Sequence, residues 1–327
     1  MTGKILVTGA PGWLGTRFVE KLVEQNRDVV CLVQKGVYTK YLEKLGIEII
    51  EGDIRTFRSL PVLKDISTIF HIAGLIHPKL FGVKELYKVN TEGTENMLRI
   101  AKASEVDKFV YISSNSPIGC NRDRDILLNE YTIPDPYMSY GKSKLLAERA
   151  VNEEHLRGLD TTILRPCWFY GIRQPLRQTK LMRMIQRGKV PLFGDGKNLR
   201  SMTYIDNLCD AMLLAEKNKI SNGETYWIAD KRPYTTLEIY ETIADLLEVD
   251  LNIRKIPAIV SKGMRIADRV LQRFGIYQKE IHVAGEMTED IACSIEKAKK
   301  DLGYKPKVDL REGMKRSIEW AGEQGLL

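Results

Sequence analysis

The stretch Lys4-Ile5-Leu6-Val7-Thr8-Gly9-Ala10-Pro11-Gly12-Trp13-Leu14-Gly15 decides the fold of this chain of 327 residues. It opens with a short apolar, β-branched run, which is typical of a buried strand. Three evenly spaced glycines follow, and Thr16–Val23 then carries apolar residues at helical spacing. Glycine permits a tight turn and lets the backbone approach a pyrophosphate, which the N–H groups of the helix N-terminus attract. The stretch therefore predicts a strand, a glycine turn and a helix that bind a dinucleotide.

A second motif, Tyr140-Gly141-Lys142-Ser143-Lys144, follows a serine pair at Ser113 and Ser114. A phenol has an ordinary pKa of about 10, too high for proton exchange at neutral pH. A lysine four residues later lies on the same helix face, and its ammonium would lower the pKa of the phenol. The alternative is a surface tyrosine beside a solvated lysine. The upstream nucleotide-binding stretch favours an acid/base pair, with a serine that holds the substrate oxygen.

Together the two motifs resemble the short-chain dehydrogenase/reductase superfamily, in its extended, epimerase/dehydratase-type branch. The GxxGxxG spacing is typical of that branch. Further segments that match it follow in order: Gly52-Asp53-Ile54, His71–Gly74, Val89–Thr94, Arg165–Gly171 and Tyr204–Asn207. Arg165-Pro166 and Gly194–Leu199 are most similar to the 3β-hydroxysteroid/sterol dehydrogenase group. The resemblance extends from residue 4 to about residue 320 and implies an NAD(P)-dependent enzyme.

The recurrence of apolar runs between helical segments predicts the fold class. The runs are Ile5–Val7, Val29–Val33, Ile47–Ile50, Thr68–His71, Phe109–Ser113, Thr161–Leu164 and Thr225–Ala229. Such alternation predicts an α/β fold with a doubly wound, parallel Rossmann sheet covered on both faces. We expect a dinucleotide-binding domain over 1–167, which 204–230 rejoins. The rest of 168–327 is expected to form a smaller, discontinuous C-terminal lobe that binds the substrate.

The second strand bears on the choice of cofactor. Enzymes that prefer NAD place an acid at its end, where it bonds the ribose 2′-hydroxyl. Here Val33 takes that place, and Gln34 and Lys35 follow it. The missing acid, with Lys35 and Arg17 as nearby basic residues, favours NADP over NAD. The resemblance assigns cofactor contacts to Gly9, Pro11, Gly12, Trp13, Leu14, Gln34, Lys35, Asp53, Ile54, Ala73, Gly74, Tyr140, Lys144 and Pro166.

The resemblance also assigns catalytic roles. Tyr140 would be the general acid/base at a substrate hydroxyl or carbonyl, and Lys144 would lower its pKa and bond the nicotinamide ribose. Ser114 would hydrogen-bond the substrate oxygen, with Ser113 and Asn115 as its competitors for that role.

Departures from the resemblance narrow the substrate class. Asn115-Ser116 stand where nucleotide-sugar dehydratases carry an Asp-Glu pair, so a dehydratase is not expected. Trp168 stands where nucleotide-sugar epimerases carry an asparagine, and an indole offers an apolar face and no acceptor. Arg200, in contrast, stands where those epimerases bind phosphate with arginine. We assign Asn115, Trp168 and Arg200 to the substrate site.

Three functional classes follow from these residues. The leading hypothesis is a dehydrogenase/reductase for a secondary alcohol or ketone of a sterol-like or other apolar-bodied molecule. The first alternative is a UDP- or GDP-sugar epimerase with tightly bound NAD(P). The second is a catalytically silent sensor that binds the cofactor, which the intact set of Ser114, Tyr140 and Lys144 argues against.

Composition limits compartment and partners. The chain is 43% apolar and 28% charged, with a net charge of +7, which are ordinary values for a globular protein. Five scattered cysteines indicate free thiols rather than disulfides or a zinc site, and we expect no metal. No signal peptide, membrane span or nucleic-acid motif is recognisable, which predicts a cytoplasmic enzyme with a small-molecule substrate. Basic residues concentrated between residues 165 and 200 are compatible with an anionic substrate or with solvated helix faces.

Two expectations concern surfaces. The segment 259–274 predicts a basic amphipathic helix whose apolar face contains Val260, Met264, Ala267, Leu271 and Phe274. That face could pack on the lobe, close over an apolar substrate, or contact a membrane surface. Relatives commonly dimerise through a four-helix bundle, so the resemblance implies a homodimer through helices near 84–104 and 139–157.

Overall fold

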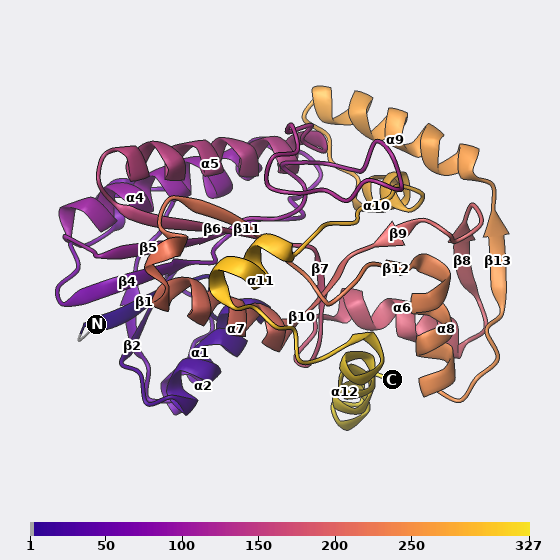
Figure 1. Ribbon diagram of the computed structural model, residues 1–327, viewed down its shortest axis with the longest axis horizontal. Coiled ribbons are helices and arrows are strands. Elements are labelled where there is room, and N and C mark those ends of the chain that lie inside the picture. The colour runs from indigo at the N-terminus through magenta and orange to yellow at the C-terminus, as the bar shows by residue number, and fades with distance from the viewer. Residues whose placement is uncertain (1–2) are drawn as a thin grey trace.

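The computed structural model describes residues 3–327, and its centre is a seven-stranded parallel sheet (Figure 1). The strands lie in the order β3-β2-β1-β4-β5-β6-β11. Their bounds are β1 Lys4–Thr8, β2 Val29–Val33, β3 Glu48–Glu51, β4 Ile66–His71, β5 Lys108–Ile112, β6 Asp160–Pro166 and β11 Glu224–Ile228. The chain starts in the middle of the sheet and winds outward in both directions, which is the doubly wound arrangement. The predicted fold class is confirmed.

Two hydrophobic cores, one on each face, explain why the central strands carry apolar residues on both sides. In β1, Ile5 and Val7 face the core on the α1 side, whereas Leu6 faces the opposite core. The register carries this alternation across the sheet, because Val7 lies opposite Cys31 on β2 and Phe70 on β4, in the same core. A strand buried on both faces has no reason to alternate apolar with polar residues.

Helices cover both faces of the sheet. On one face lie α1 (Trp13–Glu24), α2 (Lys40–Lys44), α7 (Ile205–Lys217) and α11 (Glu296–Leu302); on the other lie α3 (Val83–Tyr87), α4 (Gly93–Ala103) and α5 (Met138–Leu156) (Figure 1). The helix after the glycine turn begins at Trp13, three residues before the predicted start. Short helical turns occupy Phe57–Ser59, Lys88–Glu92 and Lys219–Ser221.

A smaller lobe extends beyond the carboxyl end of β6. It contains three two-stranded sheets, formed by β7 (Trp168–Tyr170) with β10 (Met202–Tyr204), β8 (Val190–Phe193) with β13 (Ile253–Ile256), and β9 (Leu199–Arg200) with β12 (Tyr234–Thr235). Its helices are α6 (Leu176–Gln186), α8 (Thr236–Leu246), α9 (Ala258–Arg273), α10 (Lys279–Glu286) and α12 (Leu310–Glu323). Between β10 and β12 the chain returns to the large sheet for α7 and β11. Within residues 3–327, no helix combines the length and apolar character needed to cross a bilayer.

The predicted amphipathic helix forms as α9, but its predicted apolar face is only partly buried. Of the five residues of that face, Val260, Ala267 and Phe274 are exposed, whereas Met264 and Leu271 are half-buried. The side chains that α9 buries most completely are polar, namely Ser261, Asp268 and Gln272.

Candidate active site

The glycine turn between β1 and α1 leaves no room for a side chain at its three glycine positions. Gly9 has a φ of +87°, and a Cβ built there would lie 2.7 Å from the backbone nitrogen of Ala73. A Cβ on Gly12 or Gly15 would lie 2.6 or 2.5 Å from the carbonyl oxygen of Gly9. Such distances are well below van der Waals contact. The turn can therefore approach both the start of α1 and the loop after β4 only because these residues are glycine. This cradle fits the pyrophosphate of a dinucleotide.

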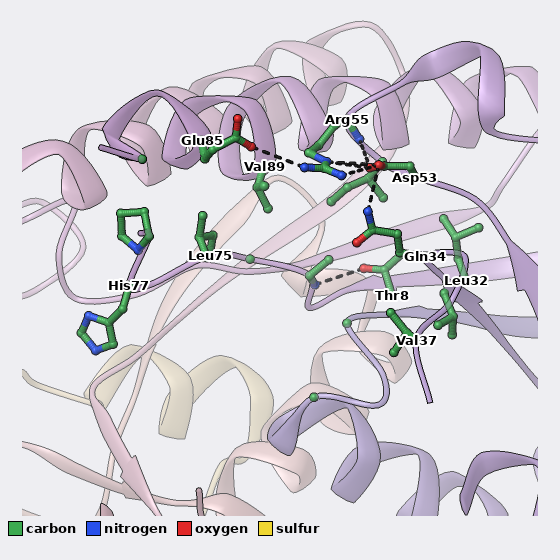
Figure 2. Close-up of a pocket in the computed structure, with 18 of the residues that line it drawn as sticks. Thr8, Leu32, Gln34, Val37, Asp53, Arg55, Leu75, His77, Glu85 and Val89 are labelled. Atoms are coloured by element: carbon green, nitrogen blue, oxygen red, sulfur yellow. Dashed lines mark hydrogen bonds and ion pairs between the residues drawn. The ribbon is translucent and has the colours of Figure 1, made fainter. Parts of the chain in front are cut away.

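A cavity of about 990 Å³ opens at the carboxyl ends of β1, β2, β3 and β4 (Figure 2). Eight of the predicted cofactor residues line it, namely Gly9, Pro11, Gly12, Gln34, Asp53, Ile54, Ala73 and Gly74. The lining also includes residues that the sequence analysis did not select, among them Thr8, Val37, Arg55, Leu75, His77, Leu80, Phe81, Glu85 and Val89. The cavity is large enough for an extended ligand and lies where doubly wound sheets bind theirs.

One wall of this cavity is a network of polar side chains, visible in Figure 2. Arg55 donates to Asp53 with a shortest distance of 2.6 Å, and its other terminal nitrogen reaches Glu85 at 3.4 Å. Gln34 donates to the same carboxylate at 3.2 Å. These hydrogen bonds, those from Arg55 first, hold the pKa of Asp53 below its ordinary value, so the side chain is an anion and an acceptor. Only the position of Arg55 two residues after Asp53 could have identified it from the sequence.

The Thr8 side chain holds the loop after β4, which forms part of the cavity lining. Its hydroxyl lies 2.8 Å from Nδ1 of His71 and accepts the backbone N–H of Ala73 at 3.1 Å. Burial lowers the pKa of His71 to about 3, so the imidazole is neutral and serves this packing. Thr8 thereby joins the end of β1 to the loop after β4.

The remaining predicted cofactor residues lie outside the cavity lining. The Trp13 indole donates to the carbonyl of Ile172 at 2.7 Å, and Leu14 is buried in the core. Lys35 is exposed, and Pro166 ends β6. Arg17, considered as a phosphate contact, is instead held by Asp206 at 2.6 Å and by Glu20 and Glu24.

The predicted catalytic lysine lies outside the cavity lining, next to Gly74, which belongs to it. Lys144 is buried on α5, and its ammonium donates to the carbonyl of Ile112 at 2.7 Å and lies 4.3 Å from the ring centre of Tyr111. A Cβ built on Gly74, a lining residue, would be 3.9 Å from its Nζ. Burial lowers the pKa of Lys144 to about 7, against the opposing effect of Glu148. Tyr140 lies one helical turn earlier on α5 and is half-buried.

The two serines of the predicted pair have different environments. Ser113 donates to a carboxylate oxygen of Glu148 at 2.6 Å, and this bond is buried. Ser114, two residues after β5, has its Oγ 3.3 Å from that of Ser116 and 3.4 Å from the amide oxygen of Asn115, both long contacts. Ser113 is thus engaged in packing, which leaves Ser114 as the serine with weakly held hydrogen bonds.

A buried ion pair lies one helical turn beyond Lys144. Glu148, one turn after Lys144 on α5, accepts from Arg165 of β6 at 2.9 and 2.7 Å. Both side chains are almost fully buried. The pair joins α5 to β6 of the sheet, and this contact was not recognised from the sequence.

Two of the three predicted substrate residues, Trp168 and Arg200, are in contact with each other in the lobe. The Arg200 guanidinium lies 4.7 Å from the ring centre of Trp168 and donates from Nη2 to the carbonyl of Glu286. Arg200 is 2% exposed, and its buried Nη1 has no hydrogen-bond partner in the described part of the chain. Asn115 is buried in the loop after β5, where its backbone carbonyl accepts from Ile118 and Gly119.

Comparisons with known proteins agree with this geometry. The sequence model of the 3-beta hydroxysteroid dehydrogenase/isomerase family matches residues 6–257, and the chain belongs to that family, within the extended short-chain dehydrogenase/reductases. It is 40% identical to the uncharacterized protein y4nL of Sinorhizobium fredii over 98% of this chain and 96% of that protein. It is 27% identical to short-chain dehydrogenase/reductase family 42E member 1 of Homo sapiens, over 98% and 88% of the two chains. The solved structure of MoeE5 in complex with UDP-glucose and NAD superposes with a TM-score of 0.76, at 26% identity, over 98% and 99%.

These findings confirm the predicted superfamily and the prediction that the chain is an enzyme. They do not name the substrate. The MoeE5 structure contains NAD, and no comparison supports the predicted preference for NADP.

Proposed function

We propose that this enzyme transfers hydride between a nicotinamide dinucleotide and a secondary alcohol or ketone carbon of a sterol-like or other apolar-bodied substrate. One observation carries the substrate class. The cation that would bind a diphosphate, Arg200, is covered by the face of Trp168 and donates to a backbone carbonyl. The name of the matching family, which refers to hydroxysteroids, supports the same class.

In this proposal the sheet domain, 1–167 with 204–230, holds the cofactor. The glycine cradle would receive the pyrophosphate, and Asp53 would accept from the adenine amino group. When bound, the dinucleotide supplies the hydride acceptor or donor. Most substrate contacts would come from the rest of 168–327.

The chain's own residues would manage the proton. In the oxidative direction, the phenolate form of Tyr140 accepts the proton of the substrate hydroxyl. Ser114 donates a hydrogen bond to the oxygen of the same hydroxyl. The protonated form of Lys144, one turn away, lowers the pKa of the phenol. In the reductive direction Tyr140 returns a proton to the carbonyl oxygen.

For the cofactor, we propose NADP in preference to NAD because position 33 carries no acid to repel a 2′-phosphate. Both Arg55 and Arg17 are held in ion pairs, but only Arg55 lines the cavity. Titration of the protein with both cofactors tests this, and tighter binding of NAD would contradict it.

A second candidate, a nucleotide-sugar epimerase, is favoured by a different observation. Nη1 of Arg200 is a buried donor without a partner in the described residues, which is what a missing anion would leave. The MoeE5 complex contains UDP-glucose, which supports the same candidate.

Product analysis separates the two candidates. Net oxidation or reduction of NAD(P) with sterol-like alcohols or ketones supports the oxidoreductase. A change of sugar stereochemistry without net cofactor turnover supports the epimerase. Trp168→Ala should reduce the turnover of an apolar substrate more than Arg200→Ala does. Arg187→Ala, at an exposed position, is the control. Salt-sensitive binding of UDP that Arg200→Ala abolishes would overturn the proposal in favour of the epimerase.

A further inference from the structure

Helix α9 is oriented by polar contacts on its inner side. Asp268 lies 2.7 Å from Nδ1 of His282 on α10, and Gln272 donates to the same carboxylate at 2.9 Å. The side-chain oxygen of Gln272 also accepts the backbone N–H of Ser139, at the start of the helix that carries Tyr140, at 3.0 Å. Buried, mutually satisfied polar groups are specific in geometry, so this cluster fixes which side of α9 faces solvent.

The side that faces solvent is apolar. Its residues recur at helical spacing and form what we call the outer stripe: Ile259 is 71% exposed, Ile266 65%, Val270 47% and Phe274 78%. Figure 1 shows α9 along the outer edge of the lobe. Four large apolar side chains exposed in a row are unusual on a protein surface and indicate a binding surface.

The stripe continues towards the cofactor cavity. Three residues beyond Phe274, Tyr277 donates its backbone N–H to the carbonyl of Leu80 at 2.6 Å, and its hydroxyl lies 2.5 Å from Nδ1 of His77. Leu80 and Phe81 line the cavity and are 42% and 75% exposed. The end of α9 and the mouth of the cavity thus lie side by side.

Positive charge flanks the outer stripe along one edge. Lys262, Arg269 and Arg273 are exposed there, whereas the single acid of α9, Asp268, is buried against His282. An apolar stripe bordered by basic residues is the pattern of a helix that lies in the interface of an anionic bilayer.

We propose that the outer stripe of α9, with Leu80 and Phe81, binds the surface of a membrane rich in anionic lipid. The basic flank decides between this occupant and a second copy of the chain. An antiparallel two-fold pairing of stripes would bring the basic edges of the two copies together, and like charges oppose such an interface. Anionic headgroups instead complement them.

Membrane binding by this surface does not depend on which of the two proposed substrate classes the enzyme uses. It would hold the mouth of the cavity against the lipid, where an apolar substrate could enter without crossing water.

Flotation of the full chain with vesicles tests the proposal. We expect binding to vesicles of equal phosphatidylglycerol and phosphatidylcholine, and much weaker binding to phosphatidylcholine alone. The variant Ile266→Ser/Phe274→Ser should weaken the partition at least about tenfold. Arg269→Gln/Arg273→Gln should weaken it by roughly fivefold for each residue, more at low salt than at high salt. The exposed Ile220→Ser and Lys189→Gln, away from α9, are the matched controls.

Two results would overturn the proposal. One is a lack of specificity: the chain binds both vesicle compositions equally, or the control variants weaken binding as much as the stripe variants do. The other is a wild-type dimer, seen by light scattering without vesicles, that Ile266→Ser/Phe274→Ser converts to a monomer, because the stripe would then bind a second copy. The melting temperature of each variant, which should equal that of the wild type, shows that the variant is folded. Ile266→Ser alone, at an exposed position, serves as a milder second variant.

Discussion

Replacing Glu148 with glutamine should strongly destabilise the protein. The carboxylate accepts two hydrogen bonds from Arg165 and one from Ser113, at 2.6 to 2.9 Å, in a region from which water is excluded. Glutamine keeps the shape but removes the charge, and leaves a buried guanidinium without its counter-ion. Breaking a buried pair in this way costs about 3–5 kcal/mol of unfolding free energy.

Urea denaturation measures the loss. The control is Glu153→Gln, an exposed position on the same helix, where we expect a change within about 0.5 kcal/mol. Removing both charges, as Glu148→Gln/Arg165→Met, should recover part of the stability, because the guanidinium that lost its counter-ion is then also removed. A loss below about 1 kcal/mol for Glu148→Gln, or simple additivity in the double variant, would refute the reasoning.

Two further predictions concern the glycine cradle and the buried Lys144. Gly15→Ala places a Cβ 2.5 Å from the Gly9 carbonyl and should weaken both dinucleotide binding and stability, measured by fluorescence titration and melting; Gly322→Ala, with no atom within 4 Å of the new Cβ, should do neither. Because the pKa of Lys144 is lowered to about 7, the folded protein without cofactor loses this proton at a pH where the unfolded chain still binds it. The unfolding free energy should therefore rise from pH 7 to pH 10.5, by at most about 1.4 kcal/mol per pH unit, and Lys144→Met should remove that rise; equal slopes in urea melts of both proteins would contradict this.

The sheet could be predicted because its cause is local. A strand buried on both faces must be apolar along its length, so each run from Ile5–Val7 to Thr225–Ala229 identifies a strand to within about two residues. The glycine turn is similarly determined, since the backbone approaches that require glycine lie mostly within the motif itself.

What the sequence did not predict depends on contacts between distant segments. The periodicity of 259–274 predicted an amphipathic helix but not which side would be buried. That side is set by His282 and by the Ser139 backbone, neither of which lies in the helix. The role of Ser113 likewise required Glu148, 35 residues away, to be seen beside it.

The path of the chain between sheet and lobe has a consequence for how the molecule can be divided or made. The strand β11 forms the edge of the sheet beside β6, and α7 covers one face, yet both follow the first lobe segments in the sequence. A chain that stops at residue 167 would leave β6 as a bare edge and the α1 side of the core partly uncovered. We therefore expect a single proteolytic cut near residue 167 not to release a stable cofactor-binding fragment. During synthesis the sheet remains incomplete until residue 228 has left the ribosome, so the lobe must begin to fold against an unfinished partner.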